Sequence, residues 1–202
     1  EDVRQLLRER AIPSVLLNRE SRSMNYVSAD HLSGMRRLLR RAESFRPGVQ
    51  PCYISFTPAE PVAGQREQAF LEACCAEEIG CGTADIYRID SVHQLDSAFV
   101  AKIRERYNTV FCFNDFVAVY LYQVMLLSGV LVPQQIGIAG YVDSPVRQLT
   151  PQKIDSVTLS PYHLGMVAGE WLHRVVIERS TESLQLRTPG DVVPGSTLGP
   201  IY

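Results

Sequence analysis

VFCFNDFVAVYLYQVMLLSGVLVPQQIGIAGYVDSP, residues 110–145, contains two short apolar segments with a longer, helix-like segment between them. The segments Thr109–Phe113 and Gly137–Tyr141 are predicted as buried strands, because they are almost continuously apolar and only a few residues long. Phe116–Ser128 has the length and spacing of an amphipathic helix, and Gly129 is a suitable residue to end it. A strand, a helix and a second strand in this order predict parallel strands joined by a helical crossover.

Polar residues stand where both predicted strands end. Asn114 comes directly after the first strand, and Asp143 lies two residues beyond the second. In open parallel sheets, ligands bind outside the carboxyl ends of the strands. The stretch therefore predicts a binding site as well as a fold.

The rest of the chain continues the alternation of strands and helices. Further strands are predicted at residues 14–18, 26–28, 52–56, 84–89, 156–159 and 190–194, and further helices at 2–11, 31–44, 64–79, 95–106 and 162–178. This pattern predicts an α/β fold with parallel sheets flanked by helices.

The composition is that of an ordinary globular protein. Of the 202 residues, 46% are hydrophobic and 21% are charged, and the net charge is -2. A chain that itself binds nucleic acid is normally basic, so we expect no nucleic-acid surface here. No segment approaches the roughly 20 apolar residues of a membrane-spanning helix. The first ten residues, EDVRQLLRER, are too charged for a signal peptide, and we expect no membrane partner.

The cysteines indicate a reducing compartment. There are five, an odd number, and Cys52 and Cys112 fall on predicted buried strands. Free thiols of this kind are typical of the cytoplasm, where we expect the protein to act. Cys74, Cys75 and Cys81 lack the spacing of a zinc site and are interpreted as small apolar helix residues.

Several segments carry a resemblance to a known family. The stretch FNDFVA…LLSGVLVPQQIGIAGYVDSP resembles the effector-binding domain of LacI/GalR transcription regulators, in which a strand, Asn-Asp, a helix, Gly-x-x-Pro and a strand ending in Gly-Phe/Tyr-Asp follow one another. Further matching segments, in the same order as in the family, are IPSVLLNRE, YVSADHLSGMRRLL, GQREQAFLEAC, IDSVTLSPYHLGMVAGEWL and VVPGST. Each segment alone is weakly specific, but together they cover most of the chain.

The resemblance implies a two-lobed, periplasmic-binding-protein-like fold. Residues 1–47 and 161–180 would form part of an N-terminal lobe, and residues 48–160 and 187–202 the C-terminal lobe. The family's helix-turn-helix DNA-binding domain and the first βα units of the N-terminal lobe have no counterpart in these residues. We therefore expect the N-terminal lobe to be incomplete and the effector to bind in the cleft between the lobes.

Arg66 and Asn114 are the strongest candidates for contacting a ligand. The planar guanidinium of Arg66 suits vicinal hydroxyls, a carboxylate or a phosphate, and the resemblance implies that it reaches into the cleft. A solvated helix arginine is the alternative. The amide of Asn114 offers donors and an acceptor to a polyhydroxyl ligand. Its alternative role is to cap the next helix, and Asp115 is assigned to the start of that helix.

Four further residues are weaker candidates. Asp143 lies one place beyond the position where the family has its ligand-binding aspartate, which Val142 occupies here. Either Asp143 turns towards the ligand, or the effector lacks the hydroxyl that this aspartate usually contacts. Asp30 matches an aspartate near the family's cleft but is also a suitable N-cap. Phe56 and Tyr141 could stack on a sugar ring or belong to the core.

The sequence offers no catalytic or metal-binding set. The histidines, which show no metal-ligand spacing, are His31, His93, His163 and His173. There is no nucleophile elbow, phosphate-binding loop or dinucleotide fingerprint. A basic cluster is formed by Arg36, Arg37, Arg40 and Arg41, and we interpret it as a solvated helix face rather than as a phosphate or nucleic-acid site. No cofactor or metal is expected.

These observations favour a ligand-sensing and dimerisation domain of a LacI/GalR-like regulator, not an enzyme. Its effector would be a sugar or sugar derivative, and its protein partner a second copy in a homodimer. Operator DNA would be bound only through a helix-turn-helix domain outside this chain. Two alternatives stay open. One is a periplasmic sugar-binding protein of a transporter, and the other is an α/β sugar-modifying enzyme. The residues leave open which effector binds, and whether it induces or co-represses.

Overall fold

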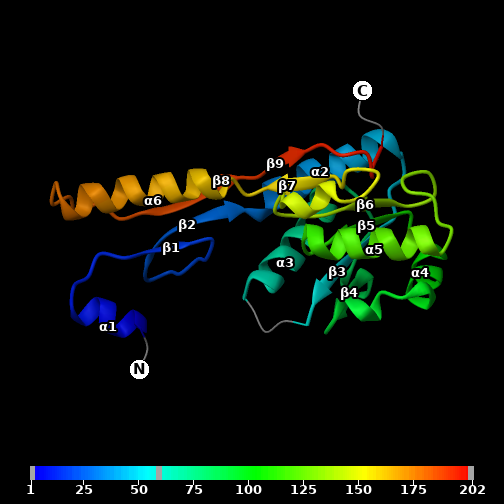
Figure 1. Cartoon of the computed structure of the whole chain (residues 1–202). Helices are drawn as coiled ribbons and strands as arrows, with labels where there is room; N and C mark the ends of the chain where they lie inside the picture. The colour runs from blue at the N-terminus through cyan, green and yellow to red at the C-terminus, as the bar shows by residue number, and fades with distance from the viewer. Residues whose placement is uncertain (1–2, 58–60, 200–202) are drawn as a thin grey trace. The chain divides into compact units, whose positions relative to one another are not determined.

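The chain forms two compact units in a computed structural model, which describes residues 3–57 and 61–199. The first unit comprises Glu1–Asp30 and Leu159–Pro189, and the second comprises His31–Thr158 and Gly190–Tyr202. Each unit is therefore built from two separate stretches of sequence, which Figure 1 allows the reader to follow by colour.

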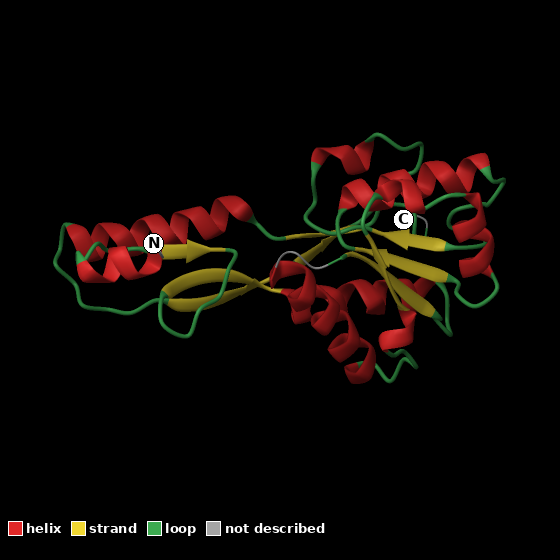
Figure 2. Ribbon diagram, turned by 90° about the horizontal axis from the view of Figure 1, so that it is seen from below, coloured by secondary structure: helices red, strands yellow, loops and turns green. Residues whose placement is uncertain are grey.

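The second unit is built on a four-stranded parallel sheet. Its strand order is β4-β3-β5-β6, and the strands are β3 (Pro51–Phe56), β4 (Ile86–Ile89), β5 (Thr109–Cys112) and β6 (Gly137–Ala139). Nearly all of their residues are buried, as expected for a parallel sheet with both faces covered. Figure 2 shows helices on both faces of this sheet.

Alternating side chains of the strands pack against different helices. Cys52 and Ile54 of β3 belong to the main apolar core with residues of α4 (Ser97–Arg104) and α5 (Asp115–Leu127). Tyr53 points to the opposite face, where its ring lies 5.1 Å from that of Phe70 in α3 (Pro61–Ala76). Because successive side chains of a strand point to opposite faces, α3 and α5 lie on opposite faces of one sheet. The helix α3 carries the candidate ligand-binding residue Arg66.

A second, smaller sheet completes this unit. β7 (Ser156–Thr158) pairs antiparallel with β9 (Asp191–Val193). The helix α2 (His31–Phe45) packs against both strands and against α3. Close contact is possible because Gly34 has no side chain: an added Cβ would lie 2.8 Å from Val157 Cγ1.

The first unit has a three-stranded parallel sheet of order β1-β2-β8. Its strands are β1 (Val15–Leu17), β2 (Asn25–Asp30) and β8 (Gln185–Pro189), and its helices are α1 (Val3–Glu9) and α6 (Pro161–Val176). The core is small, with Val27, Leu164 and Ala168 as its fully buried cluster. Among residues 3–57 and 61–199, no helix combines the length and apolarity needed to cross a membrane.

The structure corrects the expected division of the chain. Residues 31–47 were expected in the first lobe, but α2 lies in the second unit. The reason is its apolar face, since Met35, Leu38 and Leu39 are buried in the layer that α2 forms with α3 and the small sheet. The first change of unit therefore falls at Asp30–His31 rather than near residue 47. Residues 185–189, for which no strand was predicted, form β8 of the first unit.

Candidate functional site

The predicted site residues of the second unit gather at the carboxyl edge of its parallel sheet. Phe56 ends β3, Asn114 follows β5, and Tyr141 and Asp143 follow β6. Arg66 reaches the same edge from α3, because its guanidinium donates to the carbonyl oxygen of Phe113 at 2.7 Å. Chain topology alone places four of these side chains, since parallel strands end at a common edge.

Arg66 is held between two aromatic rings and is only 5% exposed. Its Cζ lies 4.5 Å from the ring centroid of Phe113 and 5.0 Å from that of Tyr141. Within the part of the chain that the structure describes, its Nε has no hydrogen-bond partner. Burial lowers the pKa of this guanidinium, although the Tyr53 and Tyr141 hydroxyls and Asp115 favour its charged form. The alternative of a solvated helix arginine is therefore wrong.

Asn114 is the N-cap of α5. Its Oδ1 accepts a hydrogen bond from the backbone N–H of Val117 at 2.9 Å. This satisfies one of the free N–H groups at the start of the helix. The cap occupies one lone pair of Oδ1 and leaves both Nδ2 donors available to a ligand.

Asp143 is paired within its own loop. Val142 and Asp143 have φ values of 99° and 57°, in the left-handed region that residues with side chains rarely adopt. In this conformation the carboxylate of Asp143 accepts a hydrogen bond from Nε of Arg147 at 2.5 Å. The departure from the family pattern at Val142 thus coincides with an aspartate that is committed to a neighbouring arginine.

Asp115 anchors that loop and was recognised in the sequence only as a helix-start residue. It is fully buried, and its carboxylate accepts hydrogen bonds from the backbone N–H of Ser144 at 2.5 Å and from the hydroxyl of Ser156 at 2.6 Å. Burial raises the pKa of Asp115, and these hydrogen bonds oppose the shift. Gly140 permits this arrangement, because an added Cβ would lie 2.2 Å from Oδ1 of Asp115.

The remaining candidates differ in their surroundings. The half-buried Phe56 packs edge-on against Phe113, with ring centroids 5.7 Å apart. Tyr141 is fully buried, and its hydroxyl lies 3.2 Å from Nδ1 of His31. Asp30 is the last residue of β2 and belongs to the first unit. Phe113, which packs on both Arg66 and Phe56, was missed, although an aromatic residue at the end of a predicted strand was a usable signal.

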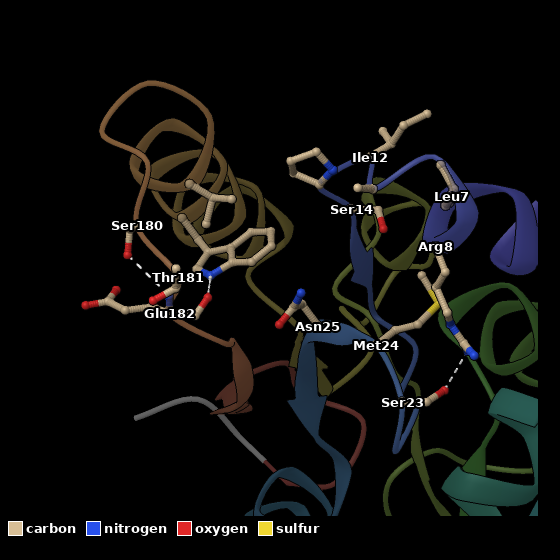
Figure 3. Close-up of a pocket in the computed structure, with 14 residues that line it drawn as sticks. Leu7, Arg8, Ile12, Ser14, Ser23, Met24, Asn25, Ser180, Thr181 and Glu182 are labelled. Atoms are coloured by element: carbon tan, nitrogen blue, oxygen red, sulfur yellow. Dashed lines mark hydrogen bonds between the residues drawn. The ribbon is translucent and has the colours of Figure 1, made fainter.

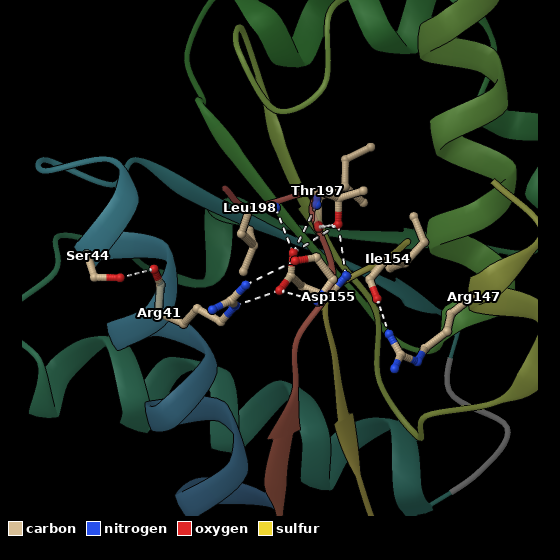
Figure 4. A network of polar contacts seen from close by, with 9 residues as sticks. Arg41, Ser44, Arg147, Ile154, Asp155, Thr197 and Leu198 are labelled. Atoms are coloured by element: carbon tan, nitrogen blue, oxygen red, sulfur yellow. Dashed lines mark hydrogen bonds and ion pairs between the residues drawn. The ribbon is translucent and has the colours of Figure 1, made fainter. Parts of the chain in front are cut away.

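A second buried carboxylate, Asp155, ties the second unit together behind this edge (Figure 4). Its Oδ1 accepts from Nε of Arg41 at 2.6 Å and from the N–H of Gly195 at 2.8 Å. Its Oδ2 accepts from the backbone N–H groups of Thr197 and Leu198 at 3.0 and 2.8 Å. Asp155 was not singled out in the sequence, because its partners come from distant segments.

The predicted basic cluster on α2 is neutralised. Arg36 and Arg40 both pair with Glu77, and Arg37 pairs with Asp191. Arg41 pairs with Asp155. The interpretation as a merely solvated face was therefore incomplete, because every arginine of the cluster has a carboxylate partner. The ion pairs also weaken any reading of this face as a phosphate-binding surface.

The first unit contains a separate pocket of about 290 Å³ (Figure 3). Ile12, Met24 and Trp171 contribute apolar walls to it. Two of its polar side chains have partners within the same unit: Nε1 of Trp171 donates to the carbonyl oxygen of Glu182 at 3.0 Å, and Arg8 donates to Ser23 at 2.8 Å. None of the predicted site residues lines it. Within residues 3–57 and 61–199, no group of His, Cys, Asp or Glu side chains is arranged to hold a metal ion.

Comparisons with known proteins agree with the fold. The family model of the periplasmic binding protein-like domain matches residues 51–198. An arabinose metabolism transcriptional repressor of Geobacillus stearothermophilus is 28% identical over 96 residues, which are 47% of this chain and 25% of that protein. The chain thus spans about a quarter of the length of this curated relative.

Solved structures extend the likeness to both units. A sugar-binding transcriptional regulator of the LacI family from Escherichia coli, complexed with phosphate, superposes with a TM-score of 0.82 at 16% identity, over 98% of this chain and 72% of that one. The transcriptional regulator CelR in complex with cellobiose gives a TM-score of 0.80 at 20% identity, over 96% and 62% of the two chains. At these identities the likeness establishes the fold.

Proposed function

The chain belongs to the periplasmic binding protein-like domain family, and from this we propose that it is the effector-binding domain of a LacI/GalR-like transcription regulator. The effector is a sugar or a sugar derivative. It binds at the carboxyl edge of the β3-β5-β6 sheet, where Arg66, Asn114 and the aromatic side chains meet. The domain senses the effector and catalyses no reaction.

One observation supports this site above all others. A buried arginine, held by Phe113 and Tyr141, stands at the sheet edge where ligands bind in parallel α/β folds. A guanidinium offers several N–H donors to closely spaced oxygens, and aromatic faces suit the apolar side of a sugar ring. Two similar proteins, an arabinose metabolism repressor and a sugar-binding regulator, favour the same ligand class.

Further partners belong to the proposal for the whole protein. We expect a homodimer that acts in the cytoplasm and reaches operator DNA through a helix-turn-helix domain outside these residues. The second unit itself is a poor DNA surface, since the arginines of α2 are all engaged with carboxylates. Sedimentation equilibrium, with and without the effector, tests the dimer.

A ligand screen by thermal unfolding tests the proposed function directly. Ligands that bind the native state stabilise it by about 2.7 kcal/mol at a concentration of 100 times Kd, which is a measurable rise in melting temperature. The screen uses pentoses, hexoses and disaccharides together with their acids and phosphates. If no member of these classes stabilises the protein, the proposed function is wrong.

Two single substitutions test the proposed site. Arg66→Ala and Asn114→Ala should each weaken binding of the ligand found in the screen by about 1–3 kcal/mol, because each removes a hydrogen bond to the ligand. Isothermal titration calorimetry gives the affinities. Arg104→Ala, on the exposed surface of α4, is the matched control and should leave the affinity unchanged. Wild-type affinity in the Arg66 and Asn114 variants would remove both residues from the site.

A further inference from the structure

Two arginines are buried in the second unit, and they differ in one respect. Arg147 is 4% exposed and has a carboxylate partner, since its Nε donates to Asp143 at 2.5 Å. Arg66 is 5% exposed, yet among the described residues no carboxylate lies within 4.0 Å of its nitrogens. A buried charge without a counter-ion is costly, so proteins rarely leave one unless function requires it.

Most N–H donors of Arg66 also lack an acceptor among the described residues. A guanidinium has five N–H donors. The described residues accept one of them, through the carbonyl oxygen of Phe113, and Nε is buried without an acceptor. The hydroxyl of Tyr53, which is close enough to influence the pKa of Arg66, is likewise buried without a partner. Unsatisfied polar groups that cluster in this way point to a missing group with several acceptor oxygens.

The two nearby acids are engaged elsewhere. Asp143 is paired with Arg147, and Asp115 accepts hydrogen bonds from Ser144 and Ser156. Neither carboxylate forms an ion pair with Arg66. Of Arg66, Asp115 and Asp143, the charged residues that the structure describes at this edge, Arg66 is the one without a partner of opposite charge or a full set of hydrogen bonds.

We infer that the effector carries an anionic group, a carboxylate or a phosphate, that pairs with Arg66. This inference rests on the proposed function and narrows its ligand class from sugars in general to sugar acids or sugar phosphates. A planar carboxylate or a phosphate accepts two parallel hydrogen bonds from a guanidinium and neutralises its charge at the same time. Two vicinal hydroxyls can accept a similar pair of hydrogen bonds, but they leave the charge of the guanidinium uncompensated. The rings of Phe113 and Tyr141 hold the guanidinium in position for such a contact.

The first experiment uses simple anions as probes and needs no knowledge of the sugar. Potassium phosphate and potassium acetate are titrated at constant ionic strength, maintained with chloride, while the melting temperature is followed. Wild-type protein and the control Arg104→Gln should be stabilised by at least one of the two anions. Arg66→Gln should respond at concentrations about tenfold higher or more. Arg66→Lys, which keeps the charge but loses the fork, should respond in between. The same response in Arg66→Gln as in wild type overturns the inference.

The stability of the ligand-free protein provides a second test. If Arg66 binds an anionic ligand and has no counter-ion without it, Arg66→Gln should melt at the wild-type temperature or above it. The reason is that the substitution removes an uncompensated buried charge. If the arginine instead holds the fold through Phe113 and Tyr141, the melting temperature of Arg66→Gln should fall sharply without ligand. That result would also overturn the inference.

The third experiment distinguishes a carboxylate from a phosphate. It also tests the anionic ligand class separately from the proposed sugar-binding function. Free sugars, their aldonic acids and their phosphate esters are compared as matched sets by calorimetry. Binding of one anionic class about tenfold or more above the neutral parent sugars supports the inference and identifies the group. Neutral sugars that bind as tightly as their anions overturn the inference but leave the proposed function intact. An Arg66-dependent response to phosphate or acetate without binding of any sugar compound overturns the proposed function instead.

Discussion

Asp155 shows how much structure one buried carboxylate can organise. It accepts hydrogen bonds from an arginine of α2 and from three backbone N–H groups between Gly195 and Leu198. The same helix carries a second Arg–Asp pair, Arg37–Asp191, whose side chains are exposed. The two pairs therefore share their chemistry and differ in burial.

Asp155→Ala should be far more damaging than Asp191→Ala. The first leaves Arg41 and buried N–H groups without an acceptor and should cost about 3–5 kcal/mol of unfolding free energy. The second breaks a pair in solvent and should cost less than about 1 kcal/mol. Urea denaturation of both variants measures the difference. Equal costs would mean that Asp155 does not carry the network.

Asp115 should give the stability of the second unit a particular pH dependence. Because its folded pKa is raised by burial, the folded protein binds a proton more readily than the unfolded chain. At neutral pH the charged carboxylate therefore costs stability. This cost should disappear as the pH falls through the folded pKa towards about 3.9, the unfolded value.

The Asp115→Asn variant isolates this effect, since its amide resembles the protonated acid. The unfolding free energy of wild type minus that of Asp115→Asn should increase as the pH is lowered from 8 to about 4. Taking the difference cancels the titration of other groups, such as Asp85, whose pKa is lowered. A difference that is flat or decreases towards low pH would show that burial does not dominate the titration of Asp115.

The packing of α2 and α3 is where glycine matters most among the helices. Gly34 faces the small sheet, and an added Cβ would lie 2.8 Å from Val157 and 3.1 Å from the Tyr141 hydroxyl. For Gly64, in α3, no atom of the described residues outside the helix's own backbone lies within 4 Å of an added Cβ. The two helices are otherwise alike in length and lie in the same unit.

The same substitution should therefore have opposite effects in these two helices. Gly34→Ala should destabilise by about 1–3 kcal/mol through overpacking. Gly64→Ala should be neutral or stabilise by up to about 1 kcal/mol, because alanine is the better helix former. Thermal or urea unfolding of each variant provides the values. A stabilising Gly34→Ala would show that α2 does not approach β7 as closely as described.

Strand prediction succeeded for the buried strands of the second unit and missed β8, the most exposed strand of the chain. β3, β5 and β6 are almost wholly buried, and their apolar runs were recognised. β8 reads QLRTP and is mostly exposed at the edge of its sheet, so it carries no apolar signal. It becomes a strand because β2 offers it hydrogen-bonding partners over five residue pairs.

The two units differ strongly in the size of their apolar cores. The main cluster of the second unit joins strands and helices from Cys52 to Ile154, whereas a cluster in the first unit has Val27, Leu164 and Ala168 as its buried members, with Val15, Val167 and Leu184 packed against it. Local stability follows buried apolar area, so the first unit should open more readily.

Hydrogen exchange, measured by mass spectrometry on the whole chain, tests this difference in local stability between the two units. Peptides from β1 and β2 should exchange faster than peptides from β3 and β5. Ligand binding at the proposed site should add protection around residues 61–70, 111–117 and 140–147. Equal protection of the two units without ligand would mean that the first unit is stabilised by more than its own core.

The alternation of strands and helices, the parallel sheet of the second unit and the carboxyl edge at which the site candidates gather could be read from the chain alone. Each follows from local periodicity and from the rule that parallel strands share a carboxyl edge, which needs no knowledge of distant contacts. The membership of α2 in the second unit, the pairing of Asp143 with Arg147 and the lack of a counter-ion at Arg66 could not. They depend on which side chains meet across the fold, and a charged residue in a sequence looks the same whether its partner is a carboxylate, an aromatic ring or a ligand.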